Sequence, residues 1–237
     1  GSDLSIPGVS SNPKGAESFL ESLGIKRYDK KKGPVTFYEL GEAKRKKFIS
    51  AIIERRKKAG IKEAEDVYTN IYILEGEEHG SFRDAREFST LLNSCGRMDN
   101  PLLGIGACLG DLKQRGRAIG SLMSYKRELI TSMNWYKDNC NNTENNKIIK
   151  GDNFIIINAR DEILSTIIGT LASMISKGRE VERNIFVMSM ARNDDESTKV
   201  SLRIAGTPDH IDLKKIITDM TRKIGGESGG HKNAAGA

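Results

Sequence analysis

A run of polar residues near the middle of the chain separates two segments with different hydrophobic patterns. Residues 138–147 read Asp-Asn-Cys-Asn-Asn-Thr-Glu-Asn-Asn-Lys, which cannot bury enough apolar surface to form a core element. Before this run the apolar residues recur at helical spacing, and after it short apolar runs alternate with helical segments. We therefore predict a helical domain over 1–138, a linker over 139–150 and a small α/β domain over 151–237, which together make an α/β (α+β) chain.

Start and stop signals delimit the helices of the first segment. Asn12-Pro13 is typical of an N-cap followed by proline at the first helical position, and Gly24 and Gly60 are typical stops. Residues 63–75 fit both a helix and a strand, and we favour a helix. Asp84 is suited to cap a further helix that runs through Cys95. The other predicted helices run from Pro13 to Gly24, over 41–59, over 63–75 and over 113–137.

The second segment alternates between strand and helix patterns. Asp212 is suited to cap the last helix. The predicted strands span 154–158, 185–191 and 199–205, and the predicted helices span 163–176 and 213–224.

Composition excludes several classes of protein. The longest purely apolar stretch is Phe154–Ile157, far shorter than a membrane helix, and no signal-peptide pattern opens the chain, so we expect a cytoplasmic protein. Its three widely spaced cysteines indicate neither a disulfide framework nor a CxxC metal site. Gly1-Ser2 is typical of an expression scar, so we expect the natural protein to extend upstream.

Basic residues concentrate at the N-terminus, where residues 1–60 hold fourteen Lys and Arg against seven Asp and Glu. Two interpretations are open. The clusters at 30–32, 44–47 and 55–58 either follow a nucleic-acid backbone or form a solvated helix face. The second interpretation suits 44–58, because Phe48, Ile49, Ile52 and Ile53 form an apolar stripe at helical spacing and the charges lie opposite it. We favour solvation.

The densest functional signal is the C-terminal run from Gly225 to Ala237. Its glycines allow a backbone to approach an anion closely with N–H donors, and His231 is able to donate to a phosphate oxygen. The small residues Ala234, Ala235 and Gly236 leave room for that ligand. A flexible glycine tail is the alternative, and composition leaves both open.

Upstream, period-two geometry places Ser201 and Arg203 on one face of a strand, where a hydroxyl and a guanidinium can meet one phosphate. An exposed pair on an edge strand is the alternative. Arg86 and Arg97 flank a predicted helix, and we favour helix-surface charges for both. Other motifs fail: Gly104-x-Gly106-x-x-x-Gly110 is not a dinucleotide fingerprint, no P-loop is present, and Asp209-His210 is not a metal site.

Gly229-Gly230-His231-x-x-Ala234-Ala235-Gly236 resembles the GGHxxAAG signature of the DHH-associated domain of DHH-family phosphoesterases. Ser201-Leu202-Arg203 resembles the companion strand, whose arginine faces the substrate phosphate in that family. Several upstream elements, chiefly 83–88, 91–98 and 108–111, are similar to archaeal RecJ-like nucleases. The resemblance therefore implies substrate-binding roles for Ser201, Arg203, Gly229, Gly230, His231, Ala234, Ala235 and Gly236.

The resemblance also implies a single-strand exonuclease in which a separate DHH domain holds two Mn²⁺ or Mg²⁺ ions. His79, His210 and His231 are scattered and lie outside carboxylate clusters, so we expect this chain to bind single-stranded nucleic acid, DNA more than RNA, and to be inactive alone. Archaeal members are associated with the GINS complex, so a non-catalytic scaffold that docks GINS through 1–138 is the alternative. An RNA-directed role is a weaker third possibility.

Overall fold

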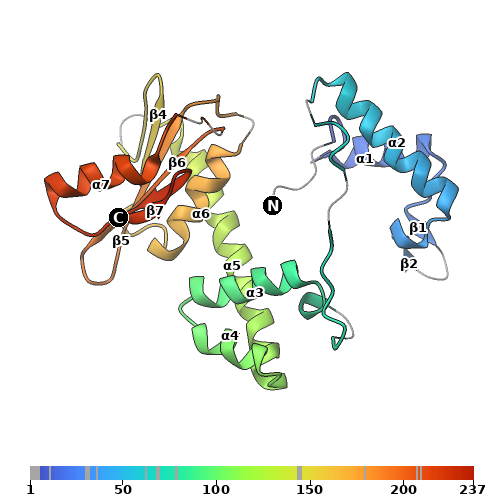
Figure 1. Ribbon diagram of the computed structural model, residues 1–237, viewed down its shortest axis with the longest axis horizontal. Helices are drawn as coiled ribbons and strands as arrows, with labels where there is room; N and C mark the ends of the chain where they lie inside the picture. Colours follow the sequence, from blue (N-terminus) through green and yellow to red (C-terminus); the bar gives the residue numbers. More distant parts are fainter. Residues whose placement is uncertain are drawn as a thin grey trace. The chain divides into compact units, whose positions relative to one another are not determined.

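The computed structural model describes residues 6–10, 12–29, 33–35, 37–61, 63–67, 70–77, 80–142, 146–178, 180–206, 208 and 210–237. The chain divides into two compact units, Gly1–Ile71 and Tyr72–Ala237 (Figure 1). The described residues form seven α-helices and, in the second unit, a six-stranded mixed sheet, which confirms the predicted α+β class.

The first unit is built on two helices. Helix α1 (Pro13–Ser22) begins as predicted, because Asn12 Oδ1 accepts a hydrogen bond of 3.0 Å from the Gly15 backbone N–H. Helix α2 (Glu42–Lys58) follows a short antiparallel pair, β1 (Tyr28–Asp29) with β2 (Gly33–Pro34), and the 3₁₀ turn η1 (Phe37–Glu39). The core of the first unit consists of Phe19, Leu23, Ile25 and Ile52.

Three helices open the second unit. After the 3₁₀ turn η2 (Gly80–Phe82), helix α3 (Ala85–Arg97) is capped as predicted by Asp84, whose Oδ1 accepts from two backbone N–H groups. Helix α4 (Pro101–Cys108) was not predicted, although Asn100-Pro101 repeats the cue that starts α1. Helix α5 (Leu112–Asn139) is the longest helix in the described part of the chain.

The helix expected over 63–75 is wrong for the residues described there. Glu63–Glu65 form a turn, and Ile73 makes an isolated antiparallel bridge with Asp84. Ile71, Tyr72, Ile73 and Leu74 are all exposed, so the helical spacing of apolar residues had no core to pack against. Tyr68 lies outside the described residues.

The sheet has the strand order β3-β4-β5-β6-β8-β7. Strands β4 and β5 pair in parallel around the crossover helix α6 (Ser165–Ser176), and the other pairs are antiparallel. The strands are β3 (Ile148–Lys150), β4 (Phe154–Asn158), β5 (Phe186–Arg192), β6 (Thr198–Ile204), β7 (Gly229–His231) and β8 (Ala234–Gly236), and helix α7 (Leu213–Ile224) precedes β7.

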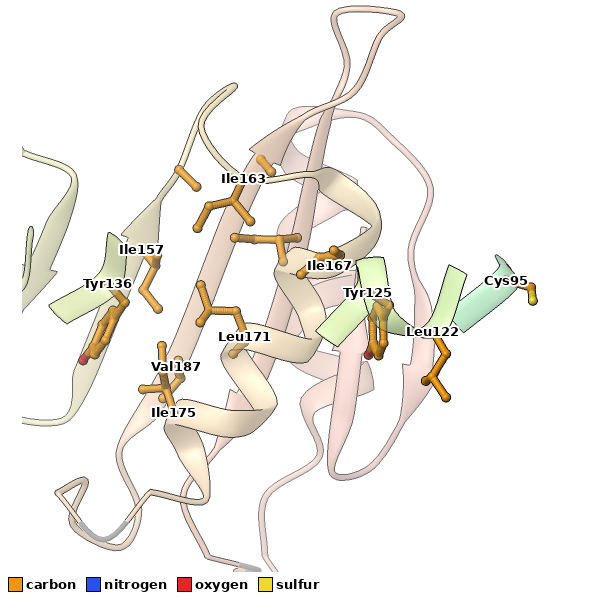
Figure 2. Close-up of a cluster of buried hydrophobic side chains, with 14 of the residues drawn as sticks. Cys95, Leu122, Tyr125, Tyr136, Ile157, Ile163, Ile167, Leu171, Ile175 and Val187 are labelled. Atoms are coloured by element: carbon orange, nitrogen blue, oxygen red, sulfur yellow. The ribbon is translucent and has the colours of Figure 1, made fainter. Parts of the chain in front are cut away.

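Each face of the sheet packs on a different helix. Ile157 and Val187 belong to the cluster that includes α6, whereas Leu202 and Ile204 pack with α7. The α6 cluster continues into the helical segment, and Figure 2 shows Tyr125 and Leu122 of α5 on the far side of α6 from Val187 and Ile157. Helix α6 therefore lies between the sheet and α5.

The polar run 138–147 begins within the last turn of α5 and precedes β3, and its residues 143–145 lie outside the described ones. The helices before it and the sheet after it nevertheless share one core and fall within one compact unit, which begins at Tyr72. A separate domain boundary at 139–150 stays a prediction. Among the described residues, no helix has the length and apolarity needed to span a bilayer.

Candidate functional site

Strand β6 carries two of the residues that the sequence predicts to bind phosphate. Successive strand residues point to opposite faces of a sheet, and Leu202 and Ile204 pack with α7. Lys199, Ser201 and Arg203 therefore share the other face, which α6 covers.

The GGHxxAAG sequence folds as a β-hairpin at the edge of the sheet. Strand β7 pairs with β8, and because His231 lies opposite Ala234, Lys232 and Asn233 form a two-residue turn. The structure therefore favours an ordered element over a flexible tail. Gly230 has a φ of 133°, and a β-carbon there would stand 2.5 Å from the carbonyl oxygen of Ala234, so this position requires glycine.

The pairing register aligns the hairpin with β6 in two rows on the α6 face. One row contains Ser201, Gly236 and Gly229, and the other contains Arg203, Ala234 and His231. The residues beside Ser201 have no side chain, and the residue beside Arg203 has only a methyl group. This arrangement leaves a hollow next to the hydroxyl and the guanidinium.

The hollow is a cavity of about 500 Å³. It brings together most of the residues predicted from the sequence: Ser201, Arg203, Gly229, Gly230, Ala234, Ala235 and Gly236. His231 shares a row with Arg203 but is exposed and does not line the cavity. Its contact with phosphate stays a prediction.

Residues 151–237 match the DHHA1 domain. The match spans all of the sheet except β3 and includes both α6 and the GGHxxAAG hairpin. It supports membership of the DHH family, as the resemblance implies, while the archaeal RecJ-like assignment stays a prediction. No curated protein matches the chain.

Within the DHHA1 domain, the Arg203 guanidinium is held rigidly. Its Nε donates to Ser173 Oγ at 2.8 Å, and its Nη1 donates to the carbonyl oxygens of Leu202 and Ala235 at 2.8 and 3.1 Å. The Nη2 group makes no hydrogen bond among the described residues. One edge of the guanidinium is therefore fixed, and the other is free to donate.

Ser201 Oγ lies beside this free edge, opposite Gly169 of α6. The nearest atoms to a β-carbon built on Gly169 would be Ser201 Oγ at 2.9 Å and Arg203 Nη2 at 3.4 Å. The Ser201 residue is only 5% exposed, and its hydroxyl makes no hydrogen bond within the described part of the chain. Two unsatisfied donors thus converge where α6 lacks a side chain.

Two further cations line the cavity, and the sequence analysis missed both as site residues. Lys199 lies two residues before Ser201 on the same face of β6, so its period-two position was the available signal. Arg97 comes from the end of α3, outside the DHHA1 domain, and the structure places it in the cavity lining where the sequence favoured a surface charge. Arg86 is exposed on α3, as expected.

The cavity holds more positive than negative charge. Its acidic lining residue is Glu227, and none of the ion pairs between described residues involves Arg97, Lys199 or Arg203. Burial lowers the pKa of both Lys199 and Arg203, and the nearby charge of Arg97 lowers each further. The charge of Arg97 therefore destabilises the charged forms of Lys199 and Arg203, and none of the three cations forms an ion pair with an acidic residue among those described.

The resemblance implies Mn²⁺ or Mg²⁺ ions that are held by a separate DHH domain. The described residues of this chain contain no group of three or more His, Cys, Asp or Glu residues able to hold a metal. His79 and Asp209 lie outside the described residues.

Most charges of α2 have partners within the first unit. Lys46 and Lys58 pair with acids of the same helix and Lys57 pairs with Glu65, while the buried Arg56 donates to backbone carbonyls. The Arg55 guanidinium stacks 4.7 Å above the Phe19 ring. These contacts favour the interpretation of residues 44–58 as a solvated face. The cluster 30–32 lies outside the described residues.

Proposed function

We propose that the second unit binds a phosphate group of single-stranded nucleic acid, as the substrate-binding part of a RecJ-like exonuclease. The observation that carries this proposal is that Ser201 Oγ and Arg203 Nη2, both packed closely against Gly169, line the same cavity. A fixed guanidinium and a hydroxyl are the donors that proteins commonly direct at phosphate oxygens.

The lining of the cavity supports binding to the backbone and not to the bases. None of its lining residues is aromatic, so it offers no platform on which a base could stack. Its cations attract phosphates of any sequence. We therefore expect affinity without sequence preference.

Cleavage belongs, in this proposal, to a DHH domain that supplies the metal ions. The residues described here bind and orient the strand. Arg203 and Ser201 contact the phosphate, and the glycines of the hairpin allow the backbone to pass close to the sheet.

Fluorescence anisotropy of the full chain with labelled, 5′-phosphorylated single-stranded DNA tests this function. We expect measurable binding that weakens steeply between about 50 and 200 mM salt, because counterions are released from the phosphates. Arg203→Ala should weaken binding about tenfold or more, since a charge-assisted hydrogen bond is lost. Arg86→Ala, which removes an exposed cation of α3 outside the cavity, is the matched control. Equal affinity of the Arg203→Ala variant and the unmodified chain at low salt would rule the function out.

An apolar surface on α4 and α5 favours a second candidate, docking of a protein partner such as GINS. Leu109, which follows α4, and Leu112, the first residue of α5, are 81% and 82% exposed, and Leu102, Ile105 and Ile130 are also exposed. Exposed apolar side chains at such density are typical of interaction surfaces. A pull-down of GINS with the full chain should succeed and should fail with Leu109→Glu and Leu112→Glu together. Failure with the unmodified chain would remove this candidate.

A further inference from the structure

A short extended segment at the start of the second unit leaves one edge of its backbone unpaired. Ile73 makes an antiparallel bridge with Asp84, and two backbone hydrogen bonds flank this bridge. The N–H of Leu74 donates one of them at 2.8 Å, and the carbonyl oxygen of Tyr72 accepts the other at 2.9 Å. In an antiparallel pair flanked in this way, the N–H and C=O of the bridged residue point away from its partner. Among the described residues, neither group of Ile73 takes part in a backbone hydrogen bond, so residues 72–74 present an open edge.

Side-chain contacts fasten this edge to the helices of the second unit. The carboxylate oxygens of Glu77 accept hydrogen bonds of 2.8 and 2.6 Å from the two terminal nitrogens of Arg115 on α5. The Nε of Arg115 donates to the carbonyl oxygen of Ala107 at 3.1 Å, and its guanidinium lies 4.8 Å from the centre of the buried Phe82 ring. An edge that is held in place before binding loses little freedom when a further strand pairs with it.

The edge lacks the features by which soluble proteins protect unpaired strands. Such strands usually carry lysine, proline or a bulge, whereas residues 70–76 contain no Lys, Arg or Pro. Tyr72 is 70% exposed, and Ile73 and Leu74 are also exposed. Tyrosine and isoleucine favour strands, and a ladder of only two strands is marginally stable by itself. These features favour the addition of a further strand at this edge.

The edge is complementary to a second copy of itself. Because the outward N–H and C=O belong to the same residue, a two-fold axis beside Ile73 allows each Ile73 to donate to and accept from the Ile73 of the second copy. This register places Tyr72 opposite Leu74 of the second copy, where apolar side chains contact across the strands. The Glu75 carboxylates of the two copies lie at opposite ends of the paired strands, so they do not face each other.

We infer that residues 72–74 form a dimerisation edge at which a second copy of this chain adds an antiparallel strand. A two-fold contact uses the same edge of both chains, so the assembly closes at two copies. The inference is independent of the phosphate cavity, because none of the residues that line the cavity belongs to this segment. An interface of this size is typical of a weak dimer that forms as the protein concentration rises.

Sedimentation equilibrium of the full chain tests the inference, with a reducing agent present and without nucleic acid. We expect the weight-average mass to rise from that of one chain toward that of two between about 1 µM and about 1 mM protein. Ile73→Lys places two like charges at the axis and should raise the dissociation constant of the dimer about tenfold or more. Leu112→Lys is the matched control, because it adds the same charge at an exposed apolar residue of α5, and it should leave the dissociation constant unchanged.

A backbone variant separates hydrogen bonding from charge. Ile73→Pro removes the outward N–H and keeps both hydrogen bonds that flank the bridge, which is how proline is tolerated on edge strands. The dimer should weaken about tenfold or more, because both of the reciprocal Ile73 hydrogen bonds are lost. Circular dichroism should stay that of the unmodified chain.

Cross-linking tests the register of the pairing. In a background where Cys108 and Cys140 are replaced by serine, Ile73→Cys should form a disulfide-linked dimer on mild oxidation. The α-carbons of a hydrogen-bonded antiparallel pair lie about 5.5 Å apart, which suits a disulfide. Tyr72→Cys in the same background should not cross-link to its own copy, because Leu74 lies opposite it.

Each outcome decides for or against the inference. A mass that stays at one chain up to about 1 mM overturns it, and so does a dimer that Ile73→Lys leaves unchanged. Equal weakening by Leu112→Lys would place the contact on the surface of α4 and α5 and would also overturn it. If Ile73→Pro is unfolded, Ile73→Lys and the cross-linking decide. The phosphate-binding function is tested separately, because these measurements contain no nucleic acid.

Discussion

Ser201 Oγ lies 2.9 Å from the point where a β-carbon on Gly169 would stand. Real side chains do not approach so closely, so any residue other than glycine at position 169 displaces the hydroxyl. The geometry of the cavity therefore requires glycine at position 169. The backbone of α6 does not require it, since no positive φ occurs at this position.

Gly169→Ala should separate stability from binding. Alanine stabilises a helix interior relative to glycine by about 0.5–1 kcal/mol, and the Ser201 hydroxyl is able to rotate away, so we expect a free energy of unfolding that is unchanged or slightly raised. The affinity for 5′-phosphorylated DNA should fall about fivefold or more, because the hydroxyl leaves its place beside Arg203. Urea denaturation and anisotropy measure the two quantities.

Gly116→Ala on α5 is the control for this variant. A β-carbon at Gly116 would have no neighbour within 4 Å. Gly116→Ala should therefore change the free energy of unfolding in the same way and leave the DNA affinity unaltered. Equal DNA affinities of the Gly169→Ala and Gly116→Ala variants would show that the position of the Ser201 hydroxyl against Gly169 does not matter for phosphate binding.

The two glycines that begin the hairpin should respond differently to alanine. Gly230 has a positive φ and its β-carbon would meet the backbone of β8, so Gly230→Ala should destabilise the second unit by about 1–3 kcal/mol. At Gly229 the added methyl group has no neighbour within 4 Å, and Gly229→Ala should keep the stability within about 0.5 kcal/mol. Thermal unfolding compares them. Similar losses for both variants would contradict the hairpin geometry.

Glu162 should make the stability of the second unit depend on pH in the acid range. Hydrogen bonds from Lys147 and then from the Trp135 indole lower the pKa of Glu162 below its ordinary value of 4.5. A carboxyl with a lowered folded pKa stabilises the protein fully above its unfolded pKa, and this contribution is lost as the pH falls through the folded pKa. Because the pair is partly exposed, we expect about 0.2–1 kcal/mol.

Fluorescence of Trp135, the single tryptophan of the chain, checks this expectation. Its emission should change with a midpoint below pH 4.5 in the unmodified chain. The Glu162→Gln variant should lose both this transition and the corresponding part of the acid dependence of unfolding. A transition that persists in Glu162→Gln would assign the titration to another group.

Arg56 should contribute more to the first unit than its charged neighbours on α2. Its Nε donates to the carbonyl of Ala64 at 3.1 Å and its Nη2 donates to the carbonyl of Glu63 at 2.8 Å. Arg56→Ala leaves these acceptors without their donors and should cost about 1–3 kcal/mol, whereas Lys57→Ala breaks an exposed ion pair and should cost less than about 1 kcal/mol. Hydrogen exchange of amides 61–67 should quicken in Arg56→Ala alone. Equal exchange in both variants would show that this contact does not hold the turn.

Local signals in the sequence predicted much of this fold. Asn12, Asp84 and Asp212 cap helices as expected, and their hydrogen bonds depend only on neighbours two or three residues away. The prediction of a helix over 63–75 was wrong because the spacing of apolar residues alone does not reveal whether they have a core to contact. The short helix α4 was missed although its Asn-Pro start was present.

The cavity was predicted only in part, because local signals in the sequence do not reveal contacts between distant elements. The alternation of β6 was enough to place Ser201 and Arg203 on one face, but the pairing of β6 with the hairpin and the position of Gly169 depend on contacts across the sheet and with α6. Arg97 was missed because its place depends on hydrogen bonds to Thr166, 69 residues away. The residues around the end of α3 contain no pattern that predicts this contact with a residue so distant in sequence.

The shared cavity also limits how this protein can be recombined during evolution. A DHHA1 sheet transferred without α3 would keep Ser201 and Arg203 but lose the arginine that α3 contributes, and α3 transferred alone would carry an arginine with no strand to face. The bonds between Arg97 and Thr166 therefore couple the end of α3 to the first turn of α6, so the residues that match the DHHA1 domain do not include all of the cavity.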